Sequence, residues 1–243
     1  LDEVGLLAQV LPEVVRLRGV EQPPEFHPEG DVWTHTMLLL EKLPEAAKIV
    51  CSDAAASVPA TLAWGALLHD VGKPATHQPP NPAVPGDRIR FNGHVEAGVR
   101  VAEEILNRLR FSNEDKEQIL ALVKNHMRFG DVRQMKQSTL KRFLRLPGFA
   151  EHLALHWLDA SSAHGDLRLY EFARAQYEAE PAAAERAAPL LTGRDLIAAG
   201  YRPSPQFKAM LALAEDAQLE GAATTREEAL AVLRRAYSME RDR

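Results

Sequence analysis

The side chains best suited to chemistry are histidines and aspartates that stand at the ends and on the faces of expected helices. His69 and Asp70 are adjacent where an apolar segment ends, and Gly72 and Pro74 follow them. A buried carboxylate is costly unless a cation neutralises it, and a divalent metal ion does so. Neighbouring residues differ by about 100° around a helix axis, so this pair can face one ion only where the helix ends. We therefore expect a metal site here.

Further residues of the same two types stand on the neighbouring expected helices. They are His35, His94, His126 and Asp159. A single histidine is more often a hydrogen-bonded structural residue than a ligand, but a helical bundle can bring all these positions to one point. Imidazole and carboxylate ligands together suit Mn, Fe, Co, Ni or Zn better than Ca. The remaining His27, His77, His152 and His156 are interpreted as structural or surface residues.

The elements that must position these residues are helices, because apolar residues recur at helical spacing almost everywhere. Residues 75–90 are rich in proline and polar residues and are expected to form a loop. Only residues 88–91 alternate as a strand does, and this stretch is short. The sequence predicts an all-α helical bundle, with helices at 32–43 (Asp31 as N-cap), 60–69, 94–110, 114–129, 138–146 and 150–162.

The composition changes after an Ala-, Glu- and Arg-rich helix expected around residues 170–188. Three short helices are expected beyond it, at 192–200, 205–219 and 225–237. Thr225 and Glu228 form a capping box at the start of the last one. We predict a domain of residues 1–188 that contains the metal site, followed by a small helical tail module of residues 189–243.

The bulk composition narrows the classes of protein. Among the 243 residues no run of eighteen apolar residues occurs, so no membrane span is expected, and no secretory signal is visible. The chain begins at Leu1 rather than Met, which suggests a processed or excised fragment. Cys51 is the single cysteine, so no intrachain disulfide can form and a cytoplasmic location is expected.

The charge of the chain bears on nucleic-acid binding. A formal net charge of -5 argues against holding nucleic acid by bulk charge. No DNA partner is expected, and any RNA contact must be local. The basic stretch 136–145, which follows Arg128 and Arg133, is one candidate surface, although such a run is more often a solvated helix face.

The order His, His-Asp, His, His, Asp resembles the HD superfamily of metal-dependent phosphohydrolases in its two-metal form, over residues 27–166. The resemblance implies that Asp70 bridges two divalent metal ions that clamp phosphoryl oxygens during in-line attack. One ion would be held by His35, His69, Asp70 and Asp159, and the other by Asp70, His94 and His126. The single-metal form of the family lacks the last two histidines.

Three cationic or polar residues near these ligands are candidates for contact with a substrate. Lys73 follows Asp70 by three residues, and the resemblance implies a catalytic role for both residues. Lys73 would contact phosphate or protonate the leaving oxygen, although a lysine after a helix can also serve the helix dipole. Arg128, just after His126, and His164, just after Asp159, are the other candidates.

The segments outside the metal pattern resemble the C-terminal half of bacterial CCA-adding tRNA nucleotidyltransferases and poly(A) polymerases. The resemblance is carried by residues 11–13, 19–24, 27–36, 92–98, 109–113 and, in the tail, 191–196, 200–203 and 207–208. The polymerase head of that family has a Gly-Gly or Gly-Ser turn followed by an Asp-x-Asp metal pair on a sheet. Neither motif nor sheet is found in this sequence, so these residues cannot carry nucleotide addition. At 203–205 the chain reads Pro-Ser-Pro where the family often has Pro-Gly-Pro.

Three functions compete at this point. The resemblance favours a phosphodiesterase or phosphatase acting on nucleotides or RNA 3′ ends, possibly of tRNA, with 2′,3′-cyclic phosphates among the substrates. The alternative is a non-catalytic tRNA- or RNA-binding body and tail. A hydrolase of dinucleoside polyphosphates or deoxynucleoside triphosphates is a third reading that the metal pattern alone leaves open. Against the second, an accessible set of two aspartates and four histidines differs from the closed tetrahedral Cys and His sites typical of structural metals.

Overall fold

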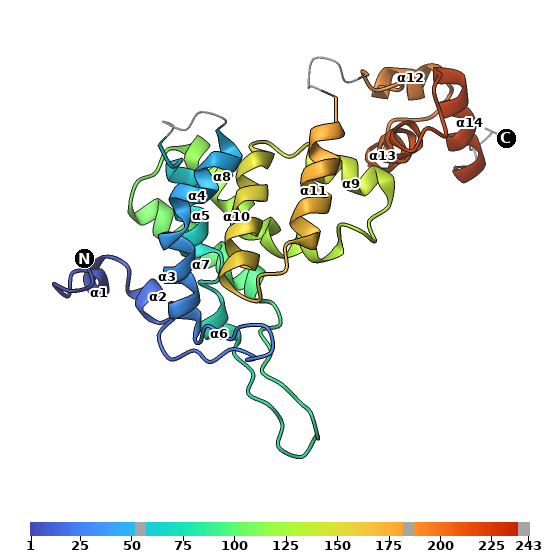
Figure 1. Ribbon diagram of the computed structural model, residues 1–243. Coiled ribbons are helices and arrows are strands. Elements are labelled where there is room, and N and C mark those ends of the chain that lie inside the picture. The colour runs from blue at the N-terminus through green and yellow to red at the C-terminus, as the bar shows by residue number, and fades with distance from the viewer. Residues whose placement is uncertain (52–56, 182–186, 238–243) are drawn as a thin grey trace. The chain divides into compact units, whose positions relative to one another are not determined.

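The computed structural model describes residues 1–51, 57–181 and 187–237, and every regular element in these ranges is a helix (Figure 1). An isolated antiparallel bridge joins Gln78 and Arg90. The all-α prediction is confirmed. The helices are α1 Leu7–Val10, α2 Pro12–Val15, α3 Val32–Glu41, α4 Leu43–Val50, α5 Ala60–Leu68, α6 Lys73–Thr76, α7 His94–Arg108, α8 Asn113–Asn125, α9 Gln137–Leu144, α10 Phe149–Ser162, α11 Arg168–Ala179, α12 Gly193–Ala198, α13 Gln206–Leu219 and α14 Arg226–Ala236, with the 3-10 helix η1 at His126–Asp131.

The chain divides into two compact units. The first contains Leu1–Asp131 and Pro147–Arg174, and the second contains Val132–Leu146 and Ala175–Arg243. The boundary predicted between residues 188 and 189 falls inside the second unit. One reason is that α9 packs against α13: the Lys141 ammonium donates to the carbonyl oxygen of Leu219 at 2.8 Å, and the Ser138 hydroxyl donates to Glu220 at 2.8 Å. As a statement about separate domains, the boundary stays a prediction.

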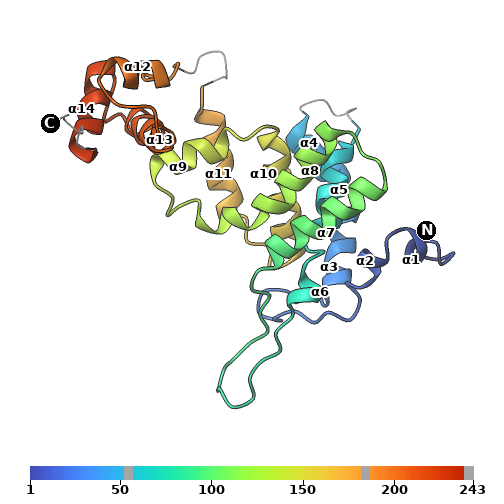
Figure 2. The same ribbon diagram turned by 180° about the vertical axis from the view of Figure 1, so that it is seen from behind.

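Helix α5 lies among the helices of the first unit and contacts α3, α8 and α10 (Figure 2). Its sequence is apolar nearly all round, as a helix with neighbours on every side requires. Leu62, Ala66 and Leu68 have no exposed surface. Gly65 allows close approach of α8, since a Cβ atom there would lie 2.7 Å from Leu122 Cδ1.

The turn after α5 touches the backbone of α7. A Cβ atom on Gly72 would lie 2.2 Å from the carbonyl oxygen of His94 and 2.4 Å from the amide nitrogen of Gly98. Backbone cannot yield as a flexible side chain can, so only glycine fits this contact. The contact holds the residues just before Gly72 against the first turn of α7, where His94 stands.

Most predicted helices occur close to their expected bounds, with three differences. The stretch from His126 continues α8 as a 3-10 helix rather than an α-helix. Helix α11 ends at Ala179, two residues before Pro181, whereas the sequence pattern predicted a helix to 188; residues 182–186 of that prediction lie outside the described residues. The short helices α1, α2, α4 and α6 were not predicted; Pro44 stands in the first turn of α4, where proline is tolerated.

The tail helices α12, α13 and α14 share a small apolar core within the second unit. It includes Leu196, Met210, Ala229 and Leu233. The predicted capping box at Thr225 and Glu228 is present at the start of α14. Over the described ranges of the chain, no helix combines the length and the apolar character needed to cross a membrane.

Candidate metal centre

The six predicted ligands meet inside the first unit. His35 comes from α3, His69 is the C-cap of α5, Asp70 follows it, His94 opens α7, His126 follows α8 and Asp159 lies on α10. The ligand atoms of these six residues gather in two groups, each with all atoms within 4.8 Å of one another, and His27, Glu29 and His35 form a third such group beside them. We call the first two the His35 group, made of His35, His69 and Asp159, and the Asp70 group, made of Asp70, His94 and His126.

The His35 group is the more deeply enclosed at its imidazoles. The side chains of His35 and His69 have no exposed surface, and their ring centroids are 5.5 Å apart. His35 Nε2 lies 3.1 Å from Asp159 Oδ1. The Nε2 atoms of both histidines are buried and have no hydrogen-bond partner in the described structure.

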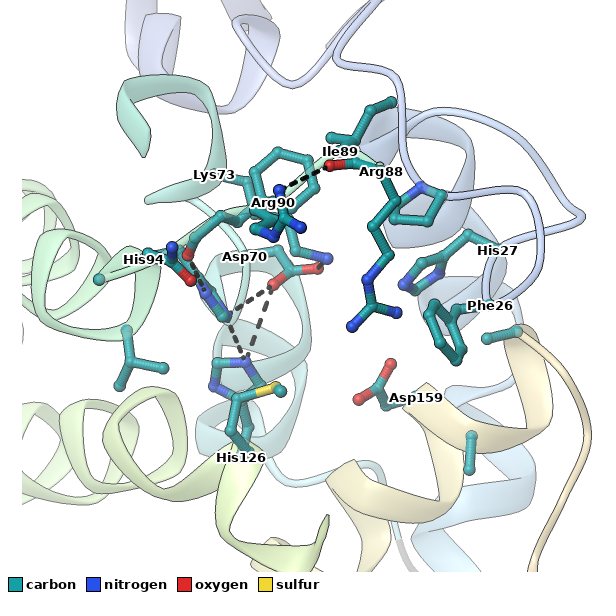
Figure 3. A pocket seen from close by; sticks show the side chains of 18 of the residues that line it. Phe26, His27, Asp70, Lys73, Arg88, Ile89, Arg90, His94, His126 and Asp159 are labelled. Atoms are coloured by element: carbon teal, nitrogen blue, oxygen red, sulfur yellow. Dashed lines mark hydrogen bonds and ion pairs between the residues drawn. The ribbon is translucent and has the colours of Figure 1, made fainter. Parts of the chain in front are cut away.

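The Asp70 group is compact and turned toward a cavity (Figure 3). His94 Nε2 and His126 Nε2 are 3.3 Å apart, and each lies 3.8 Å from Asp70 Oδ1. The other carboxylate oxygen of Asp70, Oδ2, lies 3.1 Å from His69 Nε2. The two oxygens of Asp70 therefore face the two groups separately, as a bridging ligand requires.

The remaining ring nitrogens fix the tautomers. Nδ1 of His69, His94 and His126 lies within 2.9 Å, 2.9 Å and 2.7 Å of a backbone carbonyl oxygen three residues earlier in the chain. A carbonyl only accepts, so each Nδ1 carries the proton and each Nε2 has a free lone pair. Such partners are the usual way in which a protein orients histidines toward a metal.

His35 is oriented by a side chain instead. Its Nδ1 donates to Glu29 Oε1 at 2.6 Å, and the same oxygen accepts from His27 Nδ1 at 2.9 Å. Glu29 Oε2 is buried and has no hydrogen-bond partner among the described residues. Glu29 thus ties His35 to His27, whose ring stands 4.9 Å from the His35 ring, edge to face.

These residues fit a divalent metal ion. The facing Nε2 atoms of His94 and His126, 3.3 Å apart, both present lone pairs, and the carboxylate of Asp70 adds negative charge beside them. Lone pairs and carboxylates at such spacing repel one another unless a cation joins them. The two buried Nε2 atoms of the His35 group, which have no hydrogen-bond partner in the described structure, would also be satisfied by a cation.

The electrostatics agree with this donor set. Burial raises the pKa of Asp70, but the charges of His69 and Lys73 outweigh it and hold the pKa well below its ordinary value. Burial lowers the pKa of His35, but the neighbouring carboxylates of Asp159 and Glu29 outweigh it and raise the pKa to about 9. Burial, with the charge of His69, lowers the pKa of His126 to about 4. Because His35 must lose its second proton to bind a metal, metal and proton compete there.

Lys73 is held at the edge of the Asp70 group. Its ammonium lies 2.7 Å from Asp70 Oδ2 and donates to Gln22 Oε1 at 2.7 Å. The ammonium also stands 5.3 Å from the ring centroid of Phe91. Lys73 is buried, and the nearest carboxylate to its ammonium is that of Asp70. Its charge therefore stabilises the ionised form of Asp70.

A cavity of about 690 Å³ adjoins both groups. Its walls include Asp70, His94, His126 and Asp159, together with the predicted substrate contacts Lys73 and His164. Arg128 is not among the described residues that line it, and its guanidinium donates to Asn125 Oδ1 at 3.2 Å. The role predicted for Arg128 therefore has no support from its position.

Sequence reasoning missed several residues of this cavity and its surroundings. His27 and His156, interpreted as structural or surface residues, both line it, and so do Phe26 and Arg88. His156 is also stacked on Phe129, with ring centroids 4.3 Å apart. The position of Glu29 could have been recognised in the sequence, because it is an acidic residue between Pro28 and Gly30, in the turn directly before the helix of His35.

Comparison with known proteins agrees with this architecture. Residues 32–146 match the family model of the HD domain. The chain is 34% identical over 140 residues to a multifunctional CCA protein of Actinobacillus pleuropneumoniae serotype 5b, covering 58% of this chain and 31% of that protein. It is 39% identical over 128 residues to the multifunctional CCA protein of Cupriavidus metallidurans, covering 52% of this chain and 26% of that protein.

A longer match extends to the tail. The chain is 33% identical over 240 residues to the CC-adding tRNA nucleotidyltransferase of Thermus thermophilus, covering 96% of this chain and 51% of that enzyme. The chain thus spans about half or less of the length of these curated relatives. The predicted resemblance is confirmed as a similarity of sequence: residues 32–146 match the HD domain model, and the chain is similar to tRNA nucleotidyltransferases of the CCA- and CC-adding type.

Proposed function

We propose that this chain is a metal-dependent phosphohydrolase that acts on phosphoesters of nucleotides or RNA 3′ ends, 2′,3′-cyclic phosphates among them. The observation that carries the proposal is the opening of the candidate metal centre into a cavity of about 690 Å³. A structural metal site has no use for such an opening, whereas a catalytic site must admit substrate. The HD domain at residues 32–146 supports metal-dependent hydrolysis at the level of the family.

The proposal assigns two divalent transition metal ions to the centre, from among Mn, Fe, Co, Ni and Zn. His35, His69 and Asp159 would hold one ion, His94 and His126 the other, and Asp70 would bind both. The opposed directions of the Asp70 oxygens support this assignment. When bound, such a pair of ions supplies Lewis acidity and a nucleophile at neutral pH.

The chain's own residues have distinct tasks in this proposal. The carboxylate of Asp70 would bind the metal ions. Backbone carbonyl oxygens and Glu29 keep the imidazole rings turned toward Asp70. Lys73 keeps Asp70 ionised and presents an ammonium at the cavity wall. There it can stabilise negative charge on a phosphoryl group or give a proton to the departing oxygen. His164, in the turn after α10, would contact the substrate from another part of the cavity wall.

An RNA substrate is the natural extension, because the relatives are named as tRNA nucleotidyltransferase and CCA proteins. The second candidate function, a non-catalytic RNA-binding body and tail, is favoured by the match over 96% of the chain to the CC-adding enzyme. The basic stretch 136–145 lends it little. The Lys141 ammonium donates to the Leu219 carbonyl, and Arg142 pairs with Glu215 and Asp216. Arg145 pairs with Glu180. Lys141, Arg142 and Arg145 therefore already have partners within the second unit.

The test is hydrolysis of 2′,3′-cyclic AMP by protein loaded with Mn, Co or Ni, beside Asp70→Ala. We expect turnover that depends on metal and falls to background in the variant, which should also lose both metals without unfolding. Absence of turnover against cyclic and open phosphoesters, with two metals bound per chain, would exclude the enzyme. Binding of tRNA by that inactive protein would then favour the second candidate.

A further inference from the structure

A flat aromatic ring and an arginine stand together at the cavity wall, and neither belongs to the metal centre. Phe26 lies in the segment between α2 and α3, and Arg88 lies in the loop between α6 and α7. The Arg88 guanidinium stands 4.9 Å from the centroid of the Phe26 ring. Both residues line the cavity that holds Asp70 and Asp159, and Arg88 extends into it (Figure 3).

Phe26 is exposed in a way that apolar burial does not explain. Its surface is 44% exposed although it borders a cavity with polar walls. An accessible aromatic face beside a phosphate-type site is a platform on which a nucleobase can stack, and such stacking tolerates any base.

Arg88 differs from the other cations at the cavity. Lys73 is committed to Asp70, and Arg90 pairs with Asp87 at 2.5 Å. In the described part of the chain, Arg88 has no carboxylate partner within ion-pair distance, and its side chain contacts the Phe26 ring instead. An exposed cation–π contact is weak, whereas a guanidinium binds phosphate through charge-assisted, often bidentate, hydrogen bonds. Arg88 can exchange the first partner for the second.

The loop that carries Arg88 is braced. Gln78 and Arg90 exchange backbone hydrogen bonds of 2.9 Å and 3.0 Å. Asp87 accepts from the Asn81 backbone amide at 2.6 Å, and Arg90 donates to the Arg88 carbonyl at 3.4 Å. The backbone beside Arg88 is therefore fixed while its side chain is not paired.

We propose that Phe26 and Arg88 form a nucleotide-binding subsite, in which the base stacks on Phe26 and the released guanidinium of Arg88 binds the phosphate. The inference rests on the proposed phosphohydrolase function and narrows its substrate to nucleotides whose base is free to stack. A free nucleotide or an unpaired terminal residue of RNA meets this condition. A base paired within a duplex does not.

The experiment measures equilibrium binding by calorimetry to the metal-loaded protein, so it does not depend on turnover. The probes are adenosine 2′-monophosphate, ribose 5-phosphate, which has no base, and adenosine, which has no phosphate. The variants are Phe26→Leu, which removes the ring but keeps apolar volume, and Arg88→Met, which removes the charge. Arg100→Met is the matched control, because Arg100 is an exposed arginine of α7 that does not line the cavity.

We expect Phe26→Leu to weaken binding of the nucleotide about five- to a hundredfold, the range of a base–aromatic stack, and to leave ribose 5-phosphate unchanged. Arg88→Met should weaken both phosphates about tenfold or more and leave adenosine unchanged. Arg88→Lys should recover part of the loss, and Arg100→Met should change nothing.

Equal effects of Phe26→Leu on both phosphates, or no effect of either variant, would overturn the subsite, as would failure of the wild type to bind the nucleotide more tightly than ribose 5-phosphate. The proposed function and this inference can fail separately. If hydrolysis is absent and the binding pattern holds, the subsite stands and the enzyme does not. If hydrolysis occurs without the pattern, only the subsite is wrong.

Discussion

The His35 group and the Asp70 group both gather histidines around a carboxylate, but different partners orient their histidine rings. In the Asp70 group, both histidines stand at helix ends, and backbone carbonyls three residues earlier orient their rings. In the His35 group, His35 itself stands inside α3, and a glutamate from another segment orients its ring. The two histidines of the Asp70 group are therefore oriented by backbone carbonyls, whereas His35 is oriented by a side chain six residues before it. The two groups should respond to different substitutions, although Asp70 contacts both.

The strongest way to separate the groups is His94→Ala. This removes one Nε2 from the Asp70 group and leaves the three ligands of the His35 group in place. We expect metal content to fall from two ions to one per chain, and turnover to fall about a thousandfold, because an ion that stabilises transition-state charge is worth several kcal/mol. Metal analysis and steady-state kinetics measure both. His77→Ala, at an exposed histidine outside both groups, is the control. One ion per chain in both the wild type and His94→Ala would make the centre mononuclear, and two ions in both would mean that His94 is not a ligand.

Gly72→Ala should damage the Asp70 group without touching a ligand. The added Cβ would meet the His94 carbonyl at 2.2 Å, so the turn after Asp70 and the start of α7 must separate. We expect a loss of about 3 kcal/mol in the free energy of unfolding, at the upper end of overpacking effects, measured by urea denaturation. Gly130→Ala is the matched control, since its Cβ would meet no atom within 4 Å. Equal stability of the two variants would contradict the contact.

This contact also marks the limit of what the sequence could predict. Helical spacing and helix-end signals predicted the helices that carry the six proposed ligands, because amphipathic patterns and end signals are local. The pairing of the Asp70 oxygens with separate groups depends on how α5 and α7 meet at Gly72, which no local pattern encodes. Arg88 and Phe26 were missed for the same reason: they lie in segments outside the predicted helices and meet only in the folded chain.

The side-chain support of His35 is tested by Glu29→Gln. An amide accepts hydrogen bonds from His35 and His27 more weakly than a carboxylate does, so the imidazole becomes a poorer ligand. We expect one metal ion to bind about tenfold more weakly, the lower end of the range for such outer-shell changes. Competition with a fluorescent chelator measures the affinity. Glu25→Gln, an exposed glutamate of the same segment, should bind metal as the wild type does. If Glu29→Gln weakens the ion of the Asp70 group instead, the assignment of the groups is wrong.

Lys73→Met should produce a smaller effect on turnover than His94→Ala, about a hundredfold, the lower end for a positioned proton donor, with metal content unchanged. Its ammonium is 2.7 Å from Asp70, and removing one partner of a buried ion pair is costly when the other charge is left alone. Metal ions bound to Asp70 would neutralise that charge in place of Lys73. The variant should therefore lose more stability in metal-free protein than in metal-loaded protein, which thermal unfolding with and without chelator measures. An equal loss in both states would mean that Asp70 does not bind the metals, and unchanged turnover would return Lys73 to a purely structural role.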